Sequence, residues 1–309
     1  MSGIPTNRTA VSLPTELSNE ILQKAVDSSA IMRLATKVNL PGRGLSIPQI
    51  LGDPEAAWVD ETDNKPVKNP SVGMKVMKGY TLAVILPFSN QFRRDLQALY
   101  NGILARLPGA LGKKFDQTVI GAAVKPGDNF DNLAACTAQT LIASGSVTTY
   151  DGLVAAQTDI AEHGGIMNGI ALAPQGNGIL LGAKDTTGRP IFVNSVAEGA
   201  IPQVLGVPTY AGRGLYKAGV AGEGSGTGAG TPAIVGVAGD WTQAMYGLVN
   251  DIEISFADQA SLTYTDASDQ TVTINLFQKN MFAVRCEFEA GFIAQTDCFN
   301  LLTGAIPAE

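Results

Sequence analysis

Few residues in this sequence have the types and spacing that catalysis or metal binding requires. The chain contains one histidine, His163, and three cysteines, Cys136, Cys286 and Cys298. One histidine cannot build a histidine-based zinc site or support many histidine-dependent mechanisms, and three cysteines without a C-x-x-C spacing form no even disulfide framework. We therefore predict that His163 caps a helix end or faces solvent. We expect the cysteines to be reduced thiols, with Cys286 in the core.

Other motifs also lack the setting that their chemistry needs. Residues 224–229 (GSGTGA) match the G-x-G-x-x-A pattern of dinucleotide-binding loops, but a strand-like segment follows where that site requires a helix. We interpret the surrounding segment 219–230 as a flexible loop. Four pairs of like charges are more typical of solvated faces or ion pairs between subunits than of acid–base or phosphate chemistry: Asp60/Glu61, Glu287/Glu289, Arg93/Arg94 and Lys113/Lys114. The sequence thus predicts no enzyme activity, no cofactor and no metal.

The composition excludes several further classes of protein. The 309 residues carry a net charge of −7, which disfavours a protein that wraps duplex DNA. No apolar run approaches the roughly 20 residues of a membrane helix, and the N-terminus has no signal-peptide pattern. Only 16% of residues are charged, against a typical share of about 25%. A chain so poor in charge is expected to hide surface in an assembly.

Two N-terminal segments cannot bury themselves. Residues 1–35 are polar and then helical from about residue 14, with too little apolar surface for a domain. Residues 36–78 contain five prolines, charges of both signs and only short strand-like pieces. A loop of this length inside a compact domain is uncommon. We predict an arm that packs on something else, followed by an extended hairpin that lies on a neighbour.

The next segment predicts a strand and a long helix. Residues 80–86 are apolar on both faces, which predicts a buried strand that ends at Pro87. Apolar residues then recur every three or four positions over 89–121, which predicts one long helix. Pro108 should kink or split this helix, and Gly121 should end it.

The rest of the chain predicts an α/β part and a β part. Between 149 and 247 we expect a helix over 151–162 and short strands at 169–173, 191–193 and 234–237. After 248, apolar and polar residues alternate over 251–256, 271–276 and 282–289. This alternation predicts half-buried antiparallel sheet.

The order of these segments resembles the Hong Kong 97-type major capsid proteins of tailed bacteriophages, over nearly the whole chain. Six blocks are weak alone but specific together, because they stand in the family's order and spacing. They are Pro14-Thr15-Glu16 with Ile21; Ser46-Ile47-Pro48 with Ala57-Trp58-Val59-Asp60-Glu61 and Lys65-Pro66; 78–95 (KGYTLAVILPFSNQFRRD); 181–190 (LGAKDTTGRP); 237–243 (VAGDWTQ); and 276–301, ending in Cys298-Phe299-Asn300-Leu301. The first two blocks are similar to the family's arm helix and extended loop. The third, 78–95, is similar to its strand and the start of its spine helix. The fourth and fifth are similar to a turn and a strand of its axial domain, and the sixth to its closing strands with the last helix.

The resemblance implies an α+β chain with the Hong Kong 97-type capsid fold. The parts that it implies are an N-terminal arm (1–35), an extended β-hairpin loop (36–78), a peripheral domain with an antiparallel sheet (79–148) that holds the long spine helix (about 89–121), an axial α/β domain (149–247), and a return to the peripheral domain (248–309).

The resemblance also implies a structural function. Copies of the chain would form pentamers and hexamers that close into an icosahedral head around double-stranded DNA, without sequence-specific binding. The head would assemble in the host cytoplasm and become part of the virion. A portal and a decoration protein are possible partners in this family. Some members carry a large N-terminal scaffolding segment, whereas this chain begins almost at the arm, so we expect scaffolding to be a separate protein or dispensable.

Six residues are candidates for contacts between subunits: Trp58, Asp60, Glu61, Lys65, Arg93 and Arg94. Trp58 is the foremost of them, because a large aromatic residue in an otherwise polar loop is a natural anchor on a neighbour. Asp240 and Trp241 are expected to be turn and core residues instead.

Two other functions remain open at this point. A bacterial encapsulin-like compartment shares the shell fold but encloses an enzyme cargo, so the packaged content separates it from a phage head. A soluble oligomeric enzyme of mixed fold would stay small and would need an active site, which the sequence does not supply.

Overall fold

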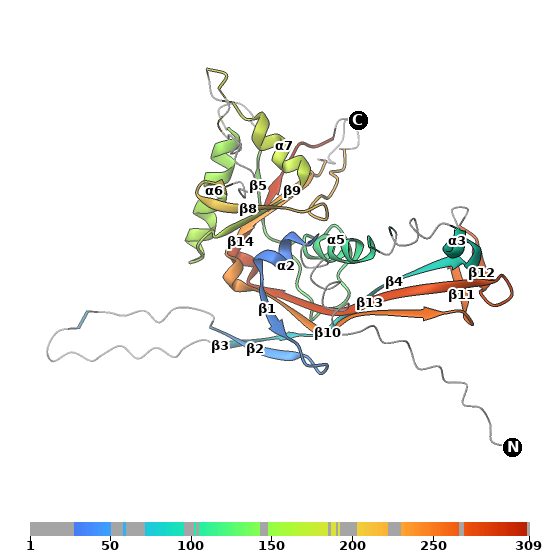
Figure 1. The fold of residues 1–309 in the computed structure, drawn as a ribbon. Helices are drawn as coiled ribbons and strands as arrows, with labels where there is room; N and C mark the ends of the chain where they lie inside the picture. The colour runs from blue at the N-terminus through green and yellow to red at the C-terminus, as the bar shows by residue number, and fades with distance from the viewer. Residues whose placement is uncertain are drawn as a thin grey trace.

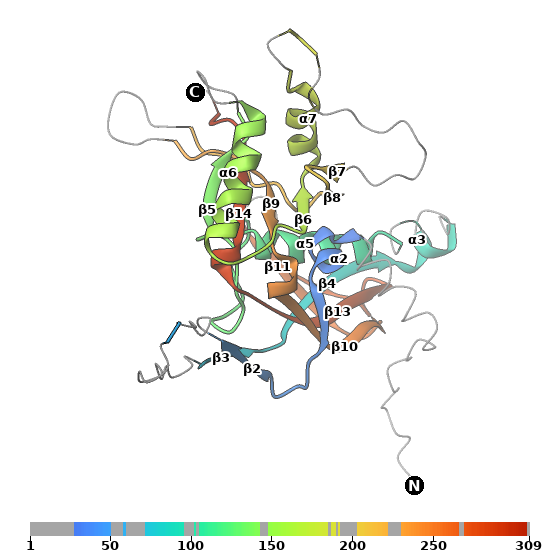
Figure 2. The same ribbon diagram turned by 90° about the vertical axis from the view of Figure 1, so that its left-hand side faces the viewer.

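The computed structural model describes residues 28–50, 58–59, 72–95, 102, 105–142, 148–184, 187–189, 191, 203–221, 230–265 and 269–307. The described chain forms a long sheet, a second and shorter sheet, and a hairpin that projects from the body where the two sheets meet (Figure 1). Figure 2 shows the same arrangement in the perpendicular view. The predicted mixed α+β class is confirmed.

The long sheet has four strands in the order β1-β10-β13-β4. They are β1 (Thr36–Asn39), β10 (Ala244–Ala257), β13 (Met281–Ala294) and β4 (Tyr80–Ser89). β10 and β13 pair antiparallel along almost their whole length, from Ala244 opposite Ala294 to Ala257 opposite Ala283. The predicted alternating sheet over 251–256 and 282–289 is therefore confirmed.

The prediction for the strand at residues 80–86 was wrong in two respects. β4 lies at the edge of the long sheet, and its side chains alternate between half-buried and exposed, so it is not buried on both faces. The strand also continues through Pro87, which pairs with Ala283. An edge strand tolerates proline because one side of the strand needs no hydrogen-bond donor. Apolar residues on the exposed side of β4, such as Ile85, led to the wrong prediction.

The second sheet has six strands in the order β5-β14-β9-β6-β8-β7. They are β5 (Thr137–Thr140), β14 (Phe299–Thr303), β9 (Ile234–Gly239), β6 (Gly169–Leu172), β8 (Val207–Ala211) and β7 (Gln203–Val204). Helices α6 (Thr149–Glu162) and α7 (Pro174–Gly182) flank this sheet. The predicted helix over 151–162 and the strands at 169–173 and 234–237 are confirmed; of the strand predicted at 191–193, only residue 191 is described.

The six-stranded sheet does not follow the boundaries expected for an axial domain of residues 149–247. β5 precedes that range and β14 follows it, yet β14 pairs parallel with β5 and antiparallel with β9. The helix expected within 276–301 is also absent: η2 (Thr296–Cys298) is a single 3-10 turn that leads directly into β14. The division into domains remains a prediction.

The long helix over 89–121 is present in part. Helix α3 (Asn90–Asp95) follows β4, and helix α5 (Leu107–Val119) begins after a turn at residues 105 and 106. Pro108 lies in the first turn of α5, where its missing N–H costs no hydrogen bond, so the predicted break is confirmed. Gly121 follows with a φ of 73°, which only glycine adopts freely, and it ends the helix as predicted.

The largest core joins α5 to both sheets. Phe115 from α5 makes edge-to-face contacts with Phe130 and with Phe292 of β13. At the junction of the sheets, Trp241 packs edge-to-face on Phe299. Its indole N–H donates to the carbonyl of Gly169, which confirms the predicted core position.

The short helix α2 (Ala30–Leu34) is held by a buried carboxylate of α5. Ser29 Oγ donates to Asp116 Oδ1 at 2.5 Å, and the Ala30 N–H donates to Asp116 Oδ2 at 3.2 Å. In the last turn of α2, the Arg33 guanidinium lies 5.2 Å from the Tyr210 ring centroid of β8. The described end of the predicted arm, residues 28–35, thus packs on the body; residues 1–27 lie outside the described part of the chain.

Burial raises the pKa of Asp116 from 3.8 to about 7, although the bonds from Ser29, Ala30 and Ile31 lower it. The folded chain therefore binds the proton more tightly than the unfolded chain between these two values, and stability falls as the pH rises through this window. We expect urea unfolding of the unassembled chain to show a free energy of unfolding that is lower at pH 8 than at pH 5, by about 2–3 kcal/mol. Asp116→Asn should flatten this dependence.

Asp151→Asn is the matched control. The Thr148 backbone N–H lowers the pKa of the exposed Asp151 carboxyl. Titration of Asp151 therefore changes the free energy of unfolding only at pH values below the ordinary pKa of aspartate, and not between pH 5 and 8. An Asp116→Asn chain that keeps the full pH dependence of the unmodified chain would contradict this assignment.

Candidate assembly surfaces

The projecting hairpin consists of β2 (Leu45–Ile50) and β3 (Val72–Met77), paired antiparallel from Leu45 opposite Met77 to Ile50 opposite Val72. This confirms the predicted hairpin within residues 36–78. Pro48 lies opposite Met74 and Ser46 opposite Val76, so these four side chains share one face by register. We call this set the outer face. Met74 is 71% exposed and Val76 38%, and Pro48 is exposed too.

The base of the hairpin is seated on the long sheet by a small core of its own. Met77 and Leu40 are fully buried with Ile293 of β13. Gly247 and Gly291 lie opposite each other on β10 and β13, directly beneath this core. A Cβ on Gly247 would stand 2.8 Å from Leu40 Cβ, and one on Gly291 would stand 2.5 Å from the Lys78 carbonyl oxygen. The glycine pair therefore leaves the space that Leu40 and Met77 occupy.

The structure places the predicted contact residues unevenly. Trp58 is fully exposed and Val59 is also exposed, in a short described stretch beyond the hairpin strands. Arg94 is exposed on α3, and Arg93 belongs to the same helix. Asp60, Glu61 and Lys65 lie outside the described residues. The structure does not bring the hairpin strands β2 and β3, between which Trp58 stands in the chain, close to helix α3, which carries Arg94: these elements lie toward opposite ends of the molecule (Figure 1).

Sequence reasoning missed two sets of exposed apolar residues. The first is the pair Met74 and Val76, whose alternate spacing in residues 72–77 was an available signal. The second lies near the far end of the long sheet, around the hairpin of β11 (Ser261–Thr265) and β12 (Thr271–Asn275). There Phe256, Tyr264 and Phe277 are all exposed. The alternation over 251–256 placed Phe256 among the inward-facing residues, while Tyr264 lies on β11 and Phe277 in the turn after β12, so no single pattern marked the three as one surface.

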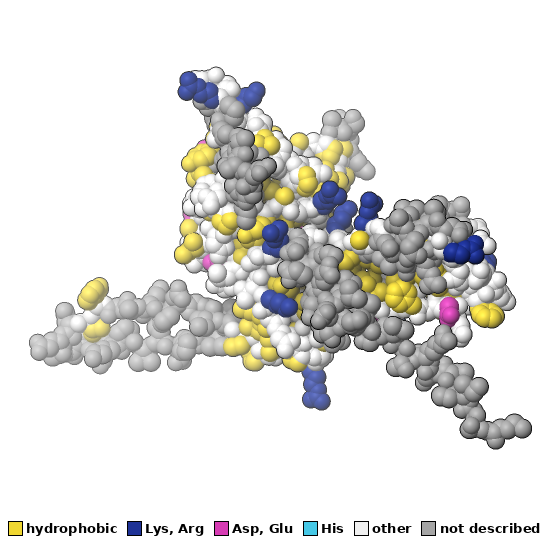
Figure 3. All heavy atoms as spheres, in the orientation of Figure 1, with side chains coloured by type: hydrophobic (Ala, Val, Ile, Leu, Met, Phe, Trp, Pro, Cys, Tyr) yellow, Lys and Arg dark blue, Asp and Glu magenta, His cyan; other side chains and the backbone are white. Residues whose placement is uncertain are grey.

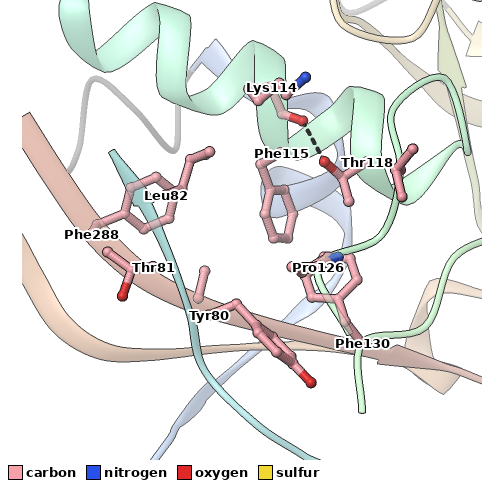
Figure 4. A pocket seen from close by; sticks show the side chains of 11 residues that line it. Tyr80, Thr81, Leu82, Lys114, Phe115, Thr118, Pro126, Phe130 and Phe288 are labelled. Carbon is pink, nitrogen blue, oxygen red and sulfur yellow. Dashed lines mark hydrogen bonds between the residues drawn. The ribbon is translucent and has the colours of Figure 1, made fainter. Parts of the chain in front are cut away.

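An apolar pocket of about 130 Å³ opens between α5, the start of β4 and the loop at 121–130 (Figure 4). Tyr80, Phe115 and Phe130 form much of its wall, and the exposed Val124 also lines it. The Thr118 hydroxyl is engaged with the Lys114 carbonyl at 2.9 Å. The lining offers no pair of groups placed for acid–base chemistry.

The reactive residue types occupy structural positions. His163 ends α6, with Nδ1 2.8 Å from the Asp159 carbonyl oxygen, and this contact raises its pKa. Burial raises the pKa of Cys136 to about 12 and that of Cys286 to about 11, and it also raises the pKa of Cys298. All three cysteines are free thiols, and Cys286 is in the core as predicted.

The described residues contain no group of three or more histidine, cysteine, aspartate or glutamate side chains that could hold a metal ion. Among the same residues, no helix has the length and apolar character to cross a membrane. Lysine and arginine side chains are scattered over the face in Figure 3 and form no continuous track. The glycine motif at 224–229 lies outside the described residues.

Asp240 holds the turn between the sheets and is not a surface contact. Its carboxylate accepts hydrogen bonds from the Ile166 N–H, the Asn168 side-chain amide and the Thr242 N–H, at 2.9 to 3.1 Å. It also caps η1 (Trp241–Gln243). The sequence prediction for Asp240 and Trp241 is confirmed.

Known phage proteins resemble this chain in sequence and in structure. The family model described as "Phage capsid family" matches residues 9–297. A "Probable major capsid protein gp17" of Mycobacterium phage L5 is 27% identical over 312 residues, which cover 96% of this chain and 90% of that protein. Its namesake in Mycobacterium phage D29 is 25% identical over 302 residues, covering 95% and 90%. A solved structure from Mycobacterium phage Cain has a TM-score of 0.70 at 19% identity, covering 100% of this chain and 96% of that one.

The two methionines of β3 should behave oppositely on truncation. Met77 is buried at the hairpin base, so Met77→Ala should lower the free energy of unfolding by about 2–5 kcal/mol. Met74→Ala, on the outer face, should change it by less than about 0.5 kcal/mol. Urea unfolding of the unassembled chain measures both. Equal losses from the two variants would contradict the assignment of inner and outer faces.

Proposed function

The chain belongs to the phage capsid family and is a structural major capsid protein with the Hong Kong 97-type fold, and we propose that its copies join as pentamers and hexamers into an icosahedral head. The observation that carries the proposal is the hairpin. Its outer face and Trp58 expose apolar side chains that the described part of the same chain does not cover. A second copy supplies the cover, since exposed apolar patches of this kind mark sites of association.

The geometry favours neighbour-to-neighbour contacts of the head-to-tail type. The hairpin of β2 and β3 lies toward one end of the molecule, while the hairpin of β11 and β12, which carries the exposed Tyr264, lies toward the other (Figure 1). Two different surfaces at opposite ends join copies in series, and such contacts close into rings when the rotation between copies allows it. Capsomers of five and six copies are rings of this type.

The proposed content of the head is double-stranded DNA. A net charge of −7 gives a shell subunit that does not bind the phosphate backbone strongly, because such binding depends on lysine and arginine. DNA is then enclosed without sequence-specific contacts. A portal, a scaffolding protein and a decoration protein complete the proposed set of partners, and assembly takes place in the host cytoplasm.

Expression of the chain alone, followed by electron microscopy, tests self-assembly. Closed shells or rings of five and six copies are the expected products. If the chain alone gives only a small uniform oligomer, the candidate scaffolding protein is added. A small oligomer that persists with the scaffold contradicts the proposal. Particles from infected cells should contain DNA, and a protein cargo in its place would indicate an encapsulin-like compartment.

Trp58→Ala should impair assembly and leave the subunit folded. The exposed indole makes no contribution to the core of its own chain, whereas loss of a central aromatic anchor typically costs about 2 kcal/mol or more per interface. We expect a several-fold lower yield of particles on electron micrographs, with an unchanged urea-unfolding curve for the subunit. Val124→Ala is the matched control, because Val124 is also strongly exposed but lies outside the hairpin. Normal particles from Trp58→Ala would refute the role of Trp58.

A further inference from the structure

On one side of the last residues of β13, no strand pairs with them among the described residues. β4 pairs with β13 only as far as Tyr80 opposite Ala290, yet β13 continues to Ala294. Asp131 takes the place of the missing strand. Its backbone N–H donates to the Phe292 carbonyl at 3.0 Å, and its Oδ2 accepts the Ala294 N–H at 3.2 Å. The sheet edge is therefore completed by one aspartate from the loop that leads to β5.

Lys75 of the hairpin reaches into this arrangement. Its Nζ donates to Asp131 Oδ2 at 2.7 Å and to the Ala294 carbonyl at 2.7 Å. Lys75 lies on the same face of the hairpin as Met77, two residues further from the base. Among the hairpin residues that the structure describes, Lys75 is the one farthest from the hairpin base that forms an ion pair with the body. The pair is only partly buried, with side-chain exposures of 35% for Lys75 and 25% for Asp131.

Three parts of the molecule meet at this point. Lys75 belongs to the hairpin, and Ala294 is the last residue of the long sheet before η2 and β14. Asp131 lies six residues before β5, which is a strand of the six-stranded sheet. A change in the direction of the hairpin therefore has to break or rearrange contacts at the point where the chain passes from one sheet to the other.

We propose that the Lys75–Asp131 pair is a latch that holds the extended hairpin in one direction relative to the body. Met77 and Leu40 provide the seat about which the hairpin turns, and Lys75 limits the turning. A partly exposed ion pair contributes little to overall stability, so the latch biases the hairpin direction without locking it. A neighbouring copy that binds the outer face can shift this balance through its preference for one direction.

The consequence for a shell rests on the proposed function. The same subunit has to fit both five-fold and six-fold rings, which place the neighbour at different angles. In every free subunit the latch gives the hairpin one starting direction. Release of the latch allows the hairpin to take the different direction that the other kind of ring requires. The latch itself is a property of the single chain and can be measured without assembly.

The experiment measures the hairpin direction in the full-length, unassembled chain. Spin labels are introduced as genetically encoded residues at Ser46, on the outer face, and at Glu253, an exposed position of β10, so the native cysteines stay unchanged. Pulsed electron paramagnetic resonance then gives the distribution of label distances. We expect one narrow distribution for the unmodified chain and a distribution about twofold wider or more in Lys75→Met, because the hairpin then samples several directions.

Lys125→Met is the matched control, because Lys125 pairs with Asp128, a residue of the same loop and not of the hairpin. It should leave the distribution narrow. Asp131→Asn should broaden it as Lys75→Met does, and it serves in its place if that variant does not fold. An unchanged narrow distribution in a folded Lys75→Met or Asp131→Asn chain would overturn the latch, whether or not the chain forms shells.

Discussion

The position of the outer face depends on the close contact between the hairpin base and the glycine pair of the long sheet. Gly247 and Gly291 face each other on neighbouring strands, and Met77 and Leu40 fill the space above them. An isolated two-stranded hairpin is at best marginally stable in water. Here the apolar contact at its base supplies the missing stability. It leaves the outer face, with Met74 and Val76, available to another molecule.

This arrangement explains the low charge content of the chain. In a monomer, apolar residues such as Trp58, Met74 and Phe277 would be exposed without benefit. In the proposed shell, each copy would both offer and cover such surfaces, and charged residues at the centre of an interface would have to be desolvated. The absence of a catalytic constellation among the described residues is consistent with this use of the surface. The thiols and the single histidine serve packing and helix termination.

The sequence predicted those features that depend on local pattern. Alternation over 251–256 and 282–289 located β10 and β13, and Pro108 located the start of α5 within the long helical segment. Features that depend on distant partners were not predicted.

β14 pairs with β5 from the other half of the chain, and nothing in residues 299–303 specifies that partner. The edge position of β4 was missed because the exposed side of this strand is also apolar. Apolar residues on both sides are typical of a buried strand in a protein that acts alone. Trp58 could be singled out by its type, but the latch at Lys75 could not, because its partners come from two distant segments.

The crossing between the two sheets determines which part of the molecule can move. The chain crosses three times: between β4 and β5, from β9 through η1 into β10, and from β13 through η2 into β14. The two crossings through η1 and η2 are tied to each other: the Asp240 N–H donates to the Cys298 carbonyl at 3.0 Å, and the Gln295 N–H donates to the Gln243 carbonyl at 3.2 Å. Trp241 and Phe299 pack between them. Two crossings that share hydrogen bonds and a buried aromatic contact resist hinge motion, since bending requires both to change together. The hairpin is held by one small core, one partly exposed ion pair and the Lys75–Ala294 hydrogen bond, so we expect it to change direction more readily than this junction.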